Sequence, residues 1–153
     1  MAIPGEEFFF YNDFEHTLDS QRRIAIPSEW RYQGAESRFV IIPARDSILQ
    51  LYTYAAFQEM ILSKVKKMSP ANALDTRALA ILGSRTQPCT CDKQGRIQLS
   101  PKLVAYAGLK DKAVLNGSML YAEILTPEKW AQRGVYENDD FLDLLERLHR
   151  NES

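Results

Sequence analysis

Residues 17–24 read TLDSQRRI and residues 90–97 read TCDKQGRI, two octets that are identical at five positions. Asp92 follows Asp19 by 73 positions, and the same offset pairs apolar residues without a gap as far as Phe57 and Trp130. A register matched over about forty residues indicates two copies of one structural unit. The sequence therefore predicts four segments: repeat one at 13–58, a helical connector at 59–85, repeat two at 86–131 and an acidic helical tail at 132–153.

Each repeat is expected to begin with two short strands joined by a tight hairpin turn. Apolar and polar residues alternate on both sides of the turns, which is typical of half-buried strands. We place the turns at 19–22 and 92–95, because an aspartate at the first turn position accepts a hydrogen bond from the backbone two residues on. Asp19, Asp92 and Gly95 are therefore predicted to be structural turn residues. Gly95 suits a left-handed backbone, and Arg22 holds the same position in the first turn.

Capping residues predict where the helices begin. Ser100 before Pro101 predicts a helix that ends at Gly108. Thr53 and Thr126 predict the start of a helix at the end of each repeat. Each of these signals is local and depends on only a few neighbouring residues.

The connector and the tail are also predicted to be helical. In the connector, apolar residues at helical spacing predict two helices, the second of which ends at Gly83. Residues 141–148 of the tail are amphipathic, and acids outnumber bases around them. Such a helix is either a packing face or a functional tail, and the packing face is the more common case.

Composition excludes several classes of protein. The 153 residues suit one domain, and 19 Lys and Arg against 20 Asp and Glu give a net charge of −1, which excludes a uniformly basic nucleic-acid coat protein. The first 20 residues contain no Lys or Arg, unlike a signal peptide, and no apolar run approaches the ~18 residues of a membrane helix. We expect a cytoplasmic protein with no membrane partner and with reduced thiols at Cys89 and Cys91.

The repeated motif resembles a known superfamily. A D-x-x-x-R turn between two short strands, followed by a proline-containing helical turn and present twice, resembles the SpoVT-AbrB superfamily. The tandem copies, the long connector and the stretch 109–130 are similar to the MraZ family of bacterial regulators. The resemblance covers roughly residues 13–131, and Arg22 stands where the family usually has glycine.

The resemblance implies a fold, a partner and an assembly. The fold would be α+β: a pseudo-two-fold swapped-hairpin (double-split) β-barrel made of two tandem AbrB-type repeats, with connecting and C-terminal helices. The partner would be double-stranded DNA, at direct repeats in the promoter of the protein's own division and cell-wall gene cluster. The chain would form a ring-shaped homo-oligomer, associated with the nucleoid, that presents its arginine-bearing turns to DNA.

The candidate DNA-contacting residues lie at the two turns. Arginine can bind guanine O6 and N7, glutamine can bind adenine, and a two-stranded ribbon fits the major groove. Alternatively, Arg23 and Arg96 only pair with Asp19 and Asp92 across their own turns. The resemblance favours DNA contact for Arg23 and both roles for Arg96. The complete set of candidates is Gln21, Arg22, Arg23, Lys93, Gln94 and Arg96.

Other chemistry is weakly indicated. Cys89-x-Cys91 could begin a metal site, but the register aligns Cys91 with Leu18 and predicts a small core residue, and structural zinc needs four ligands. No nucleophile set and no glycine-rich phosphate loop appears. We therefore expect no enzymatic activity, cofactor, metal or small-molecule substrate. The alternative to a DNA-binding regulator is an antitoxin-like protein-interaction module of the same superfamily, which only the acidic tail favours.

Overall fold

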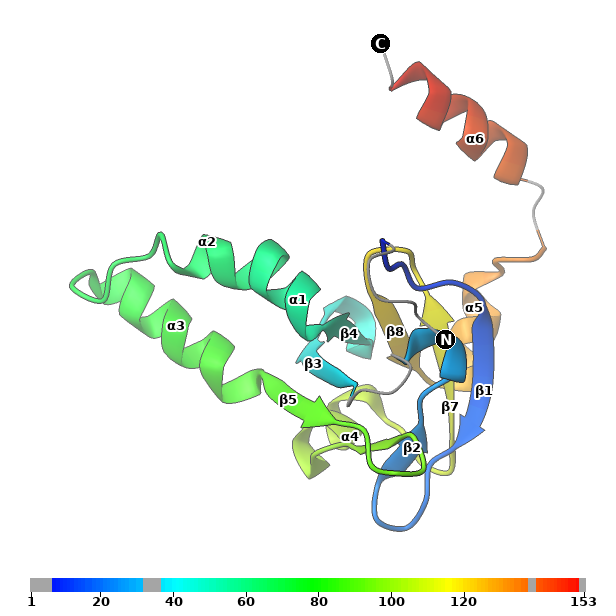
Figure 1. The fold of residues 1–153 in the computed structure, drawn as a ribbon, viewed down its shortest axis with the longest axis horizontal. Coiled ribbons are helices and arrows are strands. Elements are labelled where there is room, and N and C mark those ends of the chain that lie inside the picture. Colours follow the sequence, from blue (N-terminus) through cyan, green and yellow to red (C-terminus); the bar gives the residue numbers. More distant parts are fainter. Residues whose placement is uncertain (1–6, 32–36, 138–139, 152–153) are drawn as a thin grey trace.

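The computed structural model describes residues 7–31, 37–137 and 140–151, which form an α+β fold (Figure 1). The strands are β1 (Asp13–Thr17), β2 (Arg23–Ala25), β3 (Arg38–Pro43), β4 (Leu49–Thr53), β5 (Gln87–Thr90), β6 (Arg96–Gln98), β7 (Lys112–Gly117) and β8 (Ala122–Leu125). The helices are α1 (Tyr54–Phe57), α2 (Ser63–Val65), α3 (Ala73–Arg85), α4 (Pro101–Ala107), α5 (Pro127–Arg133) and α6 (Phe141–Arg150). The shorter helical turns are η1 (Ser28–Trp30), η2 (Arg45–Ser47) and the π-helical η3 (Gln58–Leu62), which joins α1 to α2.

The order of the elements repeats along the chain. Strands β1 to β4 and helix α1 in the first half have counterparts in β5 to β8 and α5 in the second half. The short turn η1 corresponds to the longer helix α4. The recurring order agrees with the register of 73 residues that relates the two octets.

Strands of one repeat pair with strands of the other repeat. The prediction of two hairpins, each within one repeat, is therefore wrong. Both turns form, because the backbone N–H of Arg22 donates to Asp19 O and that of Gly95 to Asp92 O, each at 3.0 Å. The strands that flank each turn nevertheless pair elsewhere: β1 with β7, β2 with β6, and β5 with β3. An alternating pattern determines which face of a strand is buried but not which strand lies beside it. The same residues are therefore compatible with either pairing.

Six strands form one antiparallel sheet, in the order β1-β7-β8-β4-β3-β5. The α+β class is confirmed, but β1 and β5 are the two edges of this sheet, and it is not closed into a barrel. Strands β2 and β6 form a separate antiparallel pair, here called the β2–β6 ribbon (Figure 1). This ribbon therefore contains one strand from each repeat.

The core lies between the sheet, the ribbon and the segment before β1. Trp30 is completely buried, and its indole N–H donates to Tyr11 O at 2.9 Å. The rings of Phe10 and Phe14 meet the indole edge-on, with centroids 5.2 and 5.5 Å away. Leu103 aligns with Trp30 in repeat two and is also buried. Trp30 thus holds the segment that precedes β1 against the core.

The predicted helix starts are confirmed. The hydroxyl of Ser100 accepts a hydrogen bond from the backbone N–H of Leu103 at 3.2 Å, and the hydroxyls of Thr53 and Thr126 cap α1 and α5 in the same way. Gly108 ends α4 in the left-handed conformation, with φ of 66°. The predicted end of the connector helix is wrong, because α3 continues to Arg85.

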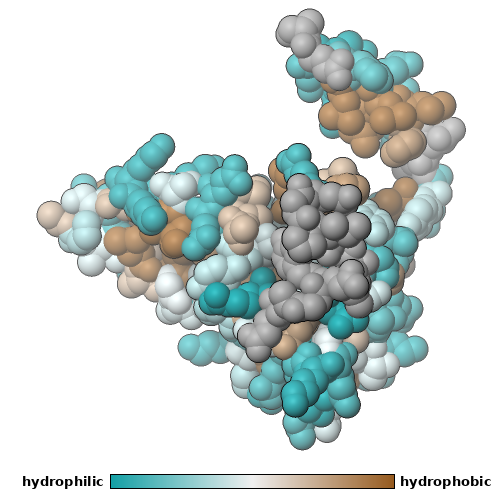
Figure 2. All heavy atoms as spheres, in the orientation of Figure 1, coloured by the Kyte–Doolittle hydropathy of each residue, from teal (hydrophilic) through white to brown (hydrophobic). Residues whose placement is uncertain are grey.

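The tail forms the predicted amphipathic helix, and its apolar face is exposed. Figure 1 shows α6 separated from the sheet, and Figure 2 shows a continuous hydrophobic patch along it. None of the helices in the described ranges is long and apolar enough to cross a membrane. The exposed apolar side chains of α6 are Phe141, Leu142, Leu144, Leu145 and Leu148.

Gly117 is expected to tolerate no side chain. A Cβ at this position would lie 2.4 Å from the backbone nitrogen of Tyr11 and 2.7 Å from the carbonyl carbon of Phe10. Overpacking of this kind costs about 1–3 kcal/mol, so Gly117→Ala should lower the free energy of unfolding by that amount in denaturant titrations. Gly83→Ala is the matched control: a Cβ there meets nothing within 4 Å, and alanine stabilises a helix interior by about 0.5–1 kcal/mol. Equal effects of the two substitutions would contradict this packing.

Candidate nucleic-acid interface

The β2–β6 ribbon has one buried and one outward face. Ile24 pairs with Ile97, and both side chains are only 1% exposed. Because side chains alternate along a strand, the neighbouring residues point to the opposite face. That outward face carries Arg23 opposite Gln98 and Ala25 opposite Arg96.

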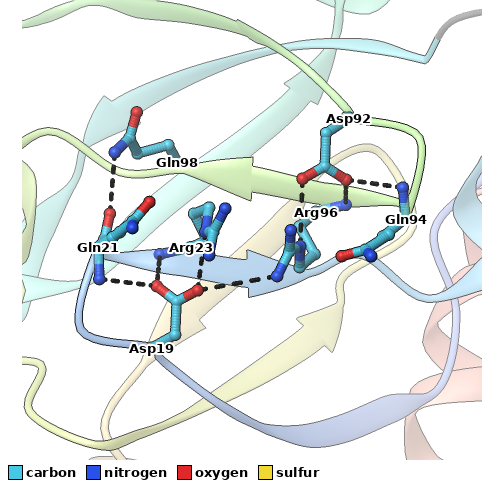
Figure 3. Close-up of polar contacts among 7 residues, drawn as sticks. All are labelled: Asp19, Gln21, Arg23, Asp92, Gln94, Arg96 and Gln98. Carbon is cyan, nitrogen blue, oxygen red and sulfur yellow. Dashed lines mark hydrogen bonds and ion pairs between the residues drawn. The ribbon is translucent and has the colours of Figure 1, made fainter.

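An aspartate organises the first turn. Asp19 Oδ1 accepts hydrogen bonds from the backbone N–H groups of Gln21 and Arg23, at 2.9 and 2.8 Å. Asp19 Oδ2 pairs with Arg23 Nε at 2.8 Å. The same carboxylate therefore closes the turn and orients the first arginine of β2 (Figure 3).

The second turn repeats this geometry. Asp92 Oδ1 accepts from the backbone N–H groups of Gln94 and Arg96, each at 2.9 Å, and Asp92 Oδ2 pairs with Arg96 Nε at 3.1 Å. The two aspartates thus occupy the positions that the sequence predicts for turn residues. Since β2 and β6 are antiparallel, the two turns lie at opposite ends of the ribbon.

Further contacts join the two turns into one surface. Arg96 Nη1 lies 3.9 Å from Asp19 Oδ2, so this arginine faces both aspartates. The side-chain amide of Gln98 donates to Gln21 O at 2.9 Å. Figure 3 shows Arg23 and Arg96 next to each other between Asp19 and Asp92. The ribbon therefore presents its two arginines in one fixed arrangement.

The ion pairs expected within the turns are present, and they leave part of each guanidinium open. Arg23 and Arg96 pair with their own aspartates through Nε, and their side chains are 31% and 29% exposed. In the described ranges, Arg23 makes no hydrogen bond through its Nη atoms. Pairing within the turn is thus compatible with contact to a second, external acceptor, and DNA contact stays a prediction.

The remaining predicted residues lie on the same ribbon. Gln21, Lys93 and Gln94 are exposed at the turns. Arg22 has φ of 60° and Gly95 has φ of 76°, so both turns use a left-handed backbone at the fourth position, as the register predicts. Arg22 does not simply extend into solvent, because its Nε donates to Leu99 O at 3.0 Å.

Sequence reasoning missed one arginine at this surface. Arg31 follows η1, and its guanidinium lies against Gly95, where a Cβ would be 2.3 Å from Arg31 Nη1. The repeat register aligns Arg31 with Val104, an apolar residue that packs against the core. The signal that could have identified Arg31 was its alignment with an apolar residue, because a charged residue at such a position suggests a separate role.

The turn carboxylates are held in their ionised form. The backbone hydrogen bond from Arg23 lowers the pKa of Asp19 below its ordinary value of 3.8, and the contacts of the Arg23 side chain act in the same direction. The backbone hydrogen bond from Arg96 lowers the pKa of Asp92 in the same way. Both carboxylates can therefore accept their hydrogen bonds at neutral pH.

The two cysteines pack as apolar groups. Burial raises the pKa of Cys89 to about 12 and that of Cys91 to about 11, so both thiols are protonated at neutral pH. Both side chains pack against the main core. In the described part of the chain, no three histidine, cysteine, aspartate or glutamate side chains gather where they could hold a metal ion.

Comparisons with known proteins give a consistent result. The family model "MraZ protein, putative antitoxin-like" matches the chain twice, at residues 9–81 and 82–151. The chain is 32% identical over 140 residues to the "Transcriptional regulator MraZ" of Pediococcus pentosaceus, covering 91% of this chain and 96% of that protein. It is 35% identical over 123 residues to the protein of the same name from Thermomicrobium roseum, covering 80% and 84%. The corresponding protein of Desulforamulus reducens is 31% identical over 140 residues, covering 91% and 96%.

Acid is expected to weaken the turns. A lowered pKa in the folded state means that each carboxylate stabilises the fold at pH values above its ordinary pKa of 3.8. This stabilisation is lost as the pH falls through the lowered pKa. The double variant Asp19→Asn/Asp92→Asn keeps an oxygen acceptor but lacks the titration, so its free energy of unfolding should fall less steeply from about pH 5 to about pH 2.

The control for this experiment is Glu59→Gln, which removes one exposed carboxylate from η3, outside the turns. Its pH dependence should follow that of the native chain in the same denaturant titrations. An identical pH dependence of the native chain and the double variant would show that the turn carboxylates do not contribute.

Proposed function

The chain belongs to the MraZ family, and from this premise we propose that it is a sequence-specific DNA-binding transcriptional regulator. Relatives that cover most of the chain are named transcriptional regulators. The observation that carries the proposal is the β2–β6 ribbon, on which both repeats present the same arginine in the same hydrogen-bonded turn. The proposed target is the promoter of the protein's own division and cell-wall gene cluster.

The charge of the ribbon supports DNA as the partner. Five cationic side chains lie on it or against it, whereas the chain as a whole has a net charge of −1. The two carboxylates at this surface, Asp19 and Asp92, are each engaged in hydrogen bonds within a turn. Positive charge at the surface of a ribbon attracts the phosphate backbone. The five cations are Arg22, Arg23, Arg31, Lys93 and Arg96.

The side chains divide into two proposed roles. A two-stranded ribbon fits the major groove, where arginine recognises guanine and glutamine recognises adenine. We assign base contact to Arg23, with Arg96 as both a turn partner and a DNA contact. Gln21 and Gln94 are exposed and suited to adenine. Arg22 and Lys93 are assigned to phosphates, which position a protein without reading sequence.

The proposal includes the closed fold of the family. We infer that the ribbon and the six-stranded sheet together make the pseudo-two-fold swapped-hairpin barrel. The pairing of β1 with β7, β3 with β5 and β2 with β6 supports this, because each pair joins one repeat to the other. The ribbon would then lie where the sheet is open.

We also propose that the chain forms a homo-oligomer, in the shape of a ring. Linked subunits raise the effective concentration of each further DNA contact, which compensates for the few cations on one ribbon. The exposed apolar face of α6 supports a contact with a second copy, because large exposed apolar patches mark interaction surfaces. Figure 1 shows α6 on the other side of the molecule from α3 and α4.

The surface of α3 and α4 suits this contact. A groove between these helices is lined by Arg85 of α3 and by Lys102 and Tyr106 of α4. A second, smaller groove beside α3 shares Arg85 and is lined by Ile81 and Leu82. The acids Asp143 and Glu146 of α6 complement these two cations. A helix of one copy bound to a different surface of the next is a head-to-tail contact, which forms rings when the rotation closes.

These proposals describe a cytoplasmic, nucleoid-associated protein that acts by binding rather than by catalysis. One observation favours a second function. The exposed apolar face of α6 would also suit an antitoxin-like module that binds another protein. The oligomeric state distinguishes the two, because self-association covers α6 without any other partner.

Arg23→Ala is expected to weaken binding to the DNA upstream of the protein's own coding sequence. Loss of a guanine contact costs about 1–3 kcal/mol and relaxes sequence preference, whereas loss of a partly exposed ion pair costs less than about 1 kcal/mol of stability. Electrophoretic shifts beside thermal melts measure both effects. Lys66→Ala, which removes one positive charge from an exposed site at the end of α2, should bind as the native chain does. Equal binding of the two variants would exclude the base contact.

Leu145→Asp is expected to dissociate the oligomer, because it places a carboxylate in the centre of the apolar face of α6. Arg85→Glu should do the same from the groove, since it reverses the complementary charge. Light scattering at micromolar concentration measures the mass. Leu120→Asp is the control, because Leu120 is 64% exposed in the turn between β7 and β8. A native monomer that binds its DNA tightly would overturn the ring.

A further inference from the structure

Each of the two turns has an additional arginine side chain, and the two come from positions that the repeat register does not relate. The turns share their aspartate hydrogen bonds and their left-handed fourth residue, which is Arg22 in one and Gly95 in the other. The side chain of Arg22 begins where a Cβ on Gly95 would stand. Arg31 occupies that space in the second turn, with its Nη1 and Cζ atoms 2.3 and 2.6 Å from that Cβ position.

The absence of a side chain at Gly95 is what admits Arg31. Any L-residue at position 95 would overlap the guanidinium, and Gly95 is buried beneath it. The register aligns Arg31 with Val104, so repeat two has no arginine at the position equivalent to Arg31. Each turn therefore has one additional guanidinium. In the first turn it belongs to the fourth turn residue, Arg22, and in the second turn it belongs to Arg31 of repeat one.

Within the described part of the chain, these two arginines differ from Arg23 and Arg96 in having no carboxylate partner. In the described ranges, no carboxylate lies within 4.0 Å of Arg22 or Arg31. Arg31 Nε is buried and makes no hydrogen bond within that part of the chain. The Asp92 carboxylate of the second turn is engaged by the backbone and side chain of Arg96. Because Nε itself is buried, an external anion would have to approach the remaining N–H groups of this guanidinium, whose side chain is partly exposed.

We propose that Arg31 is a phosphate-binding residue of the DNA interface, and that it does at the second turn what Arg22 does at the first. This inference rests on the proposed function, since the anion is a phosphate of the DNA backbone. Arginine matches phosphate geometry with paired N–H donors. Arg31 therefore contributes to affinity for any duplex and not to the choice of sequence.

The test measures DNA affinity of the full chain over a series of salt concentrations. The probes are the DNA upstream of its own coding sequence and an unrelated duplex of equal length. Arg31→Gln should weaken binding to both duplexes by the same factor. Its plot of log K against log salt should be less steep by about 0.9, the value for one lost phosphate contact. Lys66→Gln at the end of α2 removes one exposed positive charge away from the ribbon, and this control should leave both slopes unchanged.

A swap variant separates binding from folding. Arg31→Val combined with Gly95→Arg removes the overlap and places an arginine at position 95, as Arg22 stands in the first turn. This double variant should recover the native salt slope, whereas Arg31→Val alone should not. A purely structural role for Arg31 would change the melting temperature without changing the salt slope.

The outcomes distinguish this inference from the function on which it rests. If the native chain binds neither duplex, the proposed function fails. If the native chain binds and Arg23→Ala weakens it, but Arg31→Gln keeps the native affinity and slope, only the role of Arg31 is overturned. A folded swap variant that keeps the reduced slope of Arg31→Val would overturn the equivalence of the two arginines.

Discussion

The bond between each turn aspartate and two backbone N–H groups is the constraint on which this structure depends. Asp19 and Asp92 each fix a reversal of the chain that sends the following strand away from the preceding one. The following strands, β2 and β6, then pair with each other through backbone hydrogen bonds and bury Ile24 against Ile97. Neither strand has a partner without the other repeat, so the two repeats fold as one unit rather than as two domains.

Local features of this fold could be predicted from the sequence, and features that join distant residues could not. The caps at Ser100, Thr53 and Thr126 involve only their own helices, and the left-handed backbone at Arg22 followed from its alignment with Gly95. The exchange of strands was missed because an alternating pattern is equally compatible with a hairpin. Arg31 was missed because its place at the second turn depends on contact with Gly95, far along the chain.

The two repeats have diverged at several aligned positions but agree at the polar residues of their turns. Trp30 and Leu103 occupy aligned positions, but only the indole provides an N–H that holds the backbone at Tyr11. The turn η1 is short where its counterpart α4 has seven residues. On the ribbon, by contrast, the aspartate, the glutamine and the arginine of the turn are the same in both repeats. The shared chemistry therefore lies in these three turn residues.

If the ribbon binds a duplex as we propose, its near-symmetry bears on the direction in which it lies there. Rotation of the ribbon by 180° about its pseudo-two-fold axis exchanges β2 with β6 and presents almost the same side chains. The backbone geometry of the ribbon therefore barely distinguishes the two directions along a duplex. What distinguishes them are the positions at which the repeats differ, above all Ala25 opposite Arg96 and Gln98 opposite Arg23. Recognition of a site in one direction only would then depend on the methyl group of Ala25 and the amide of Gln98, together with Arg22, which the repeat register aligns with Gly95 at the turns.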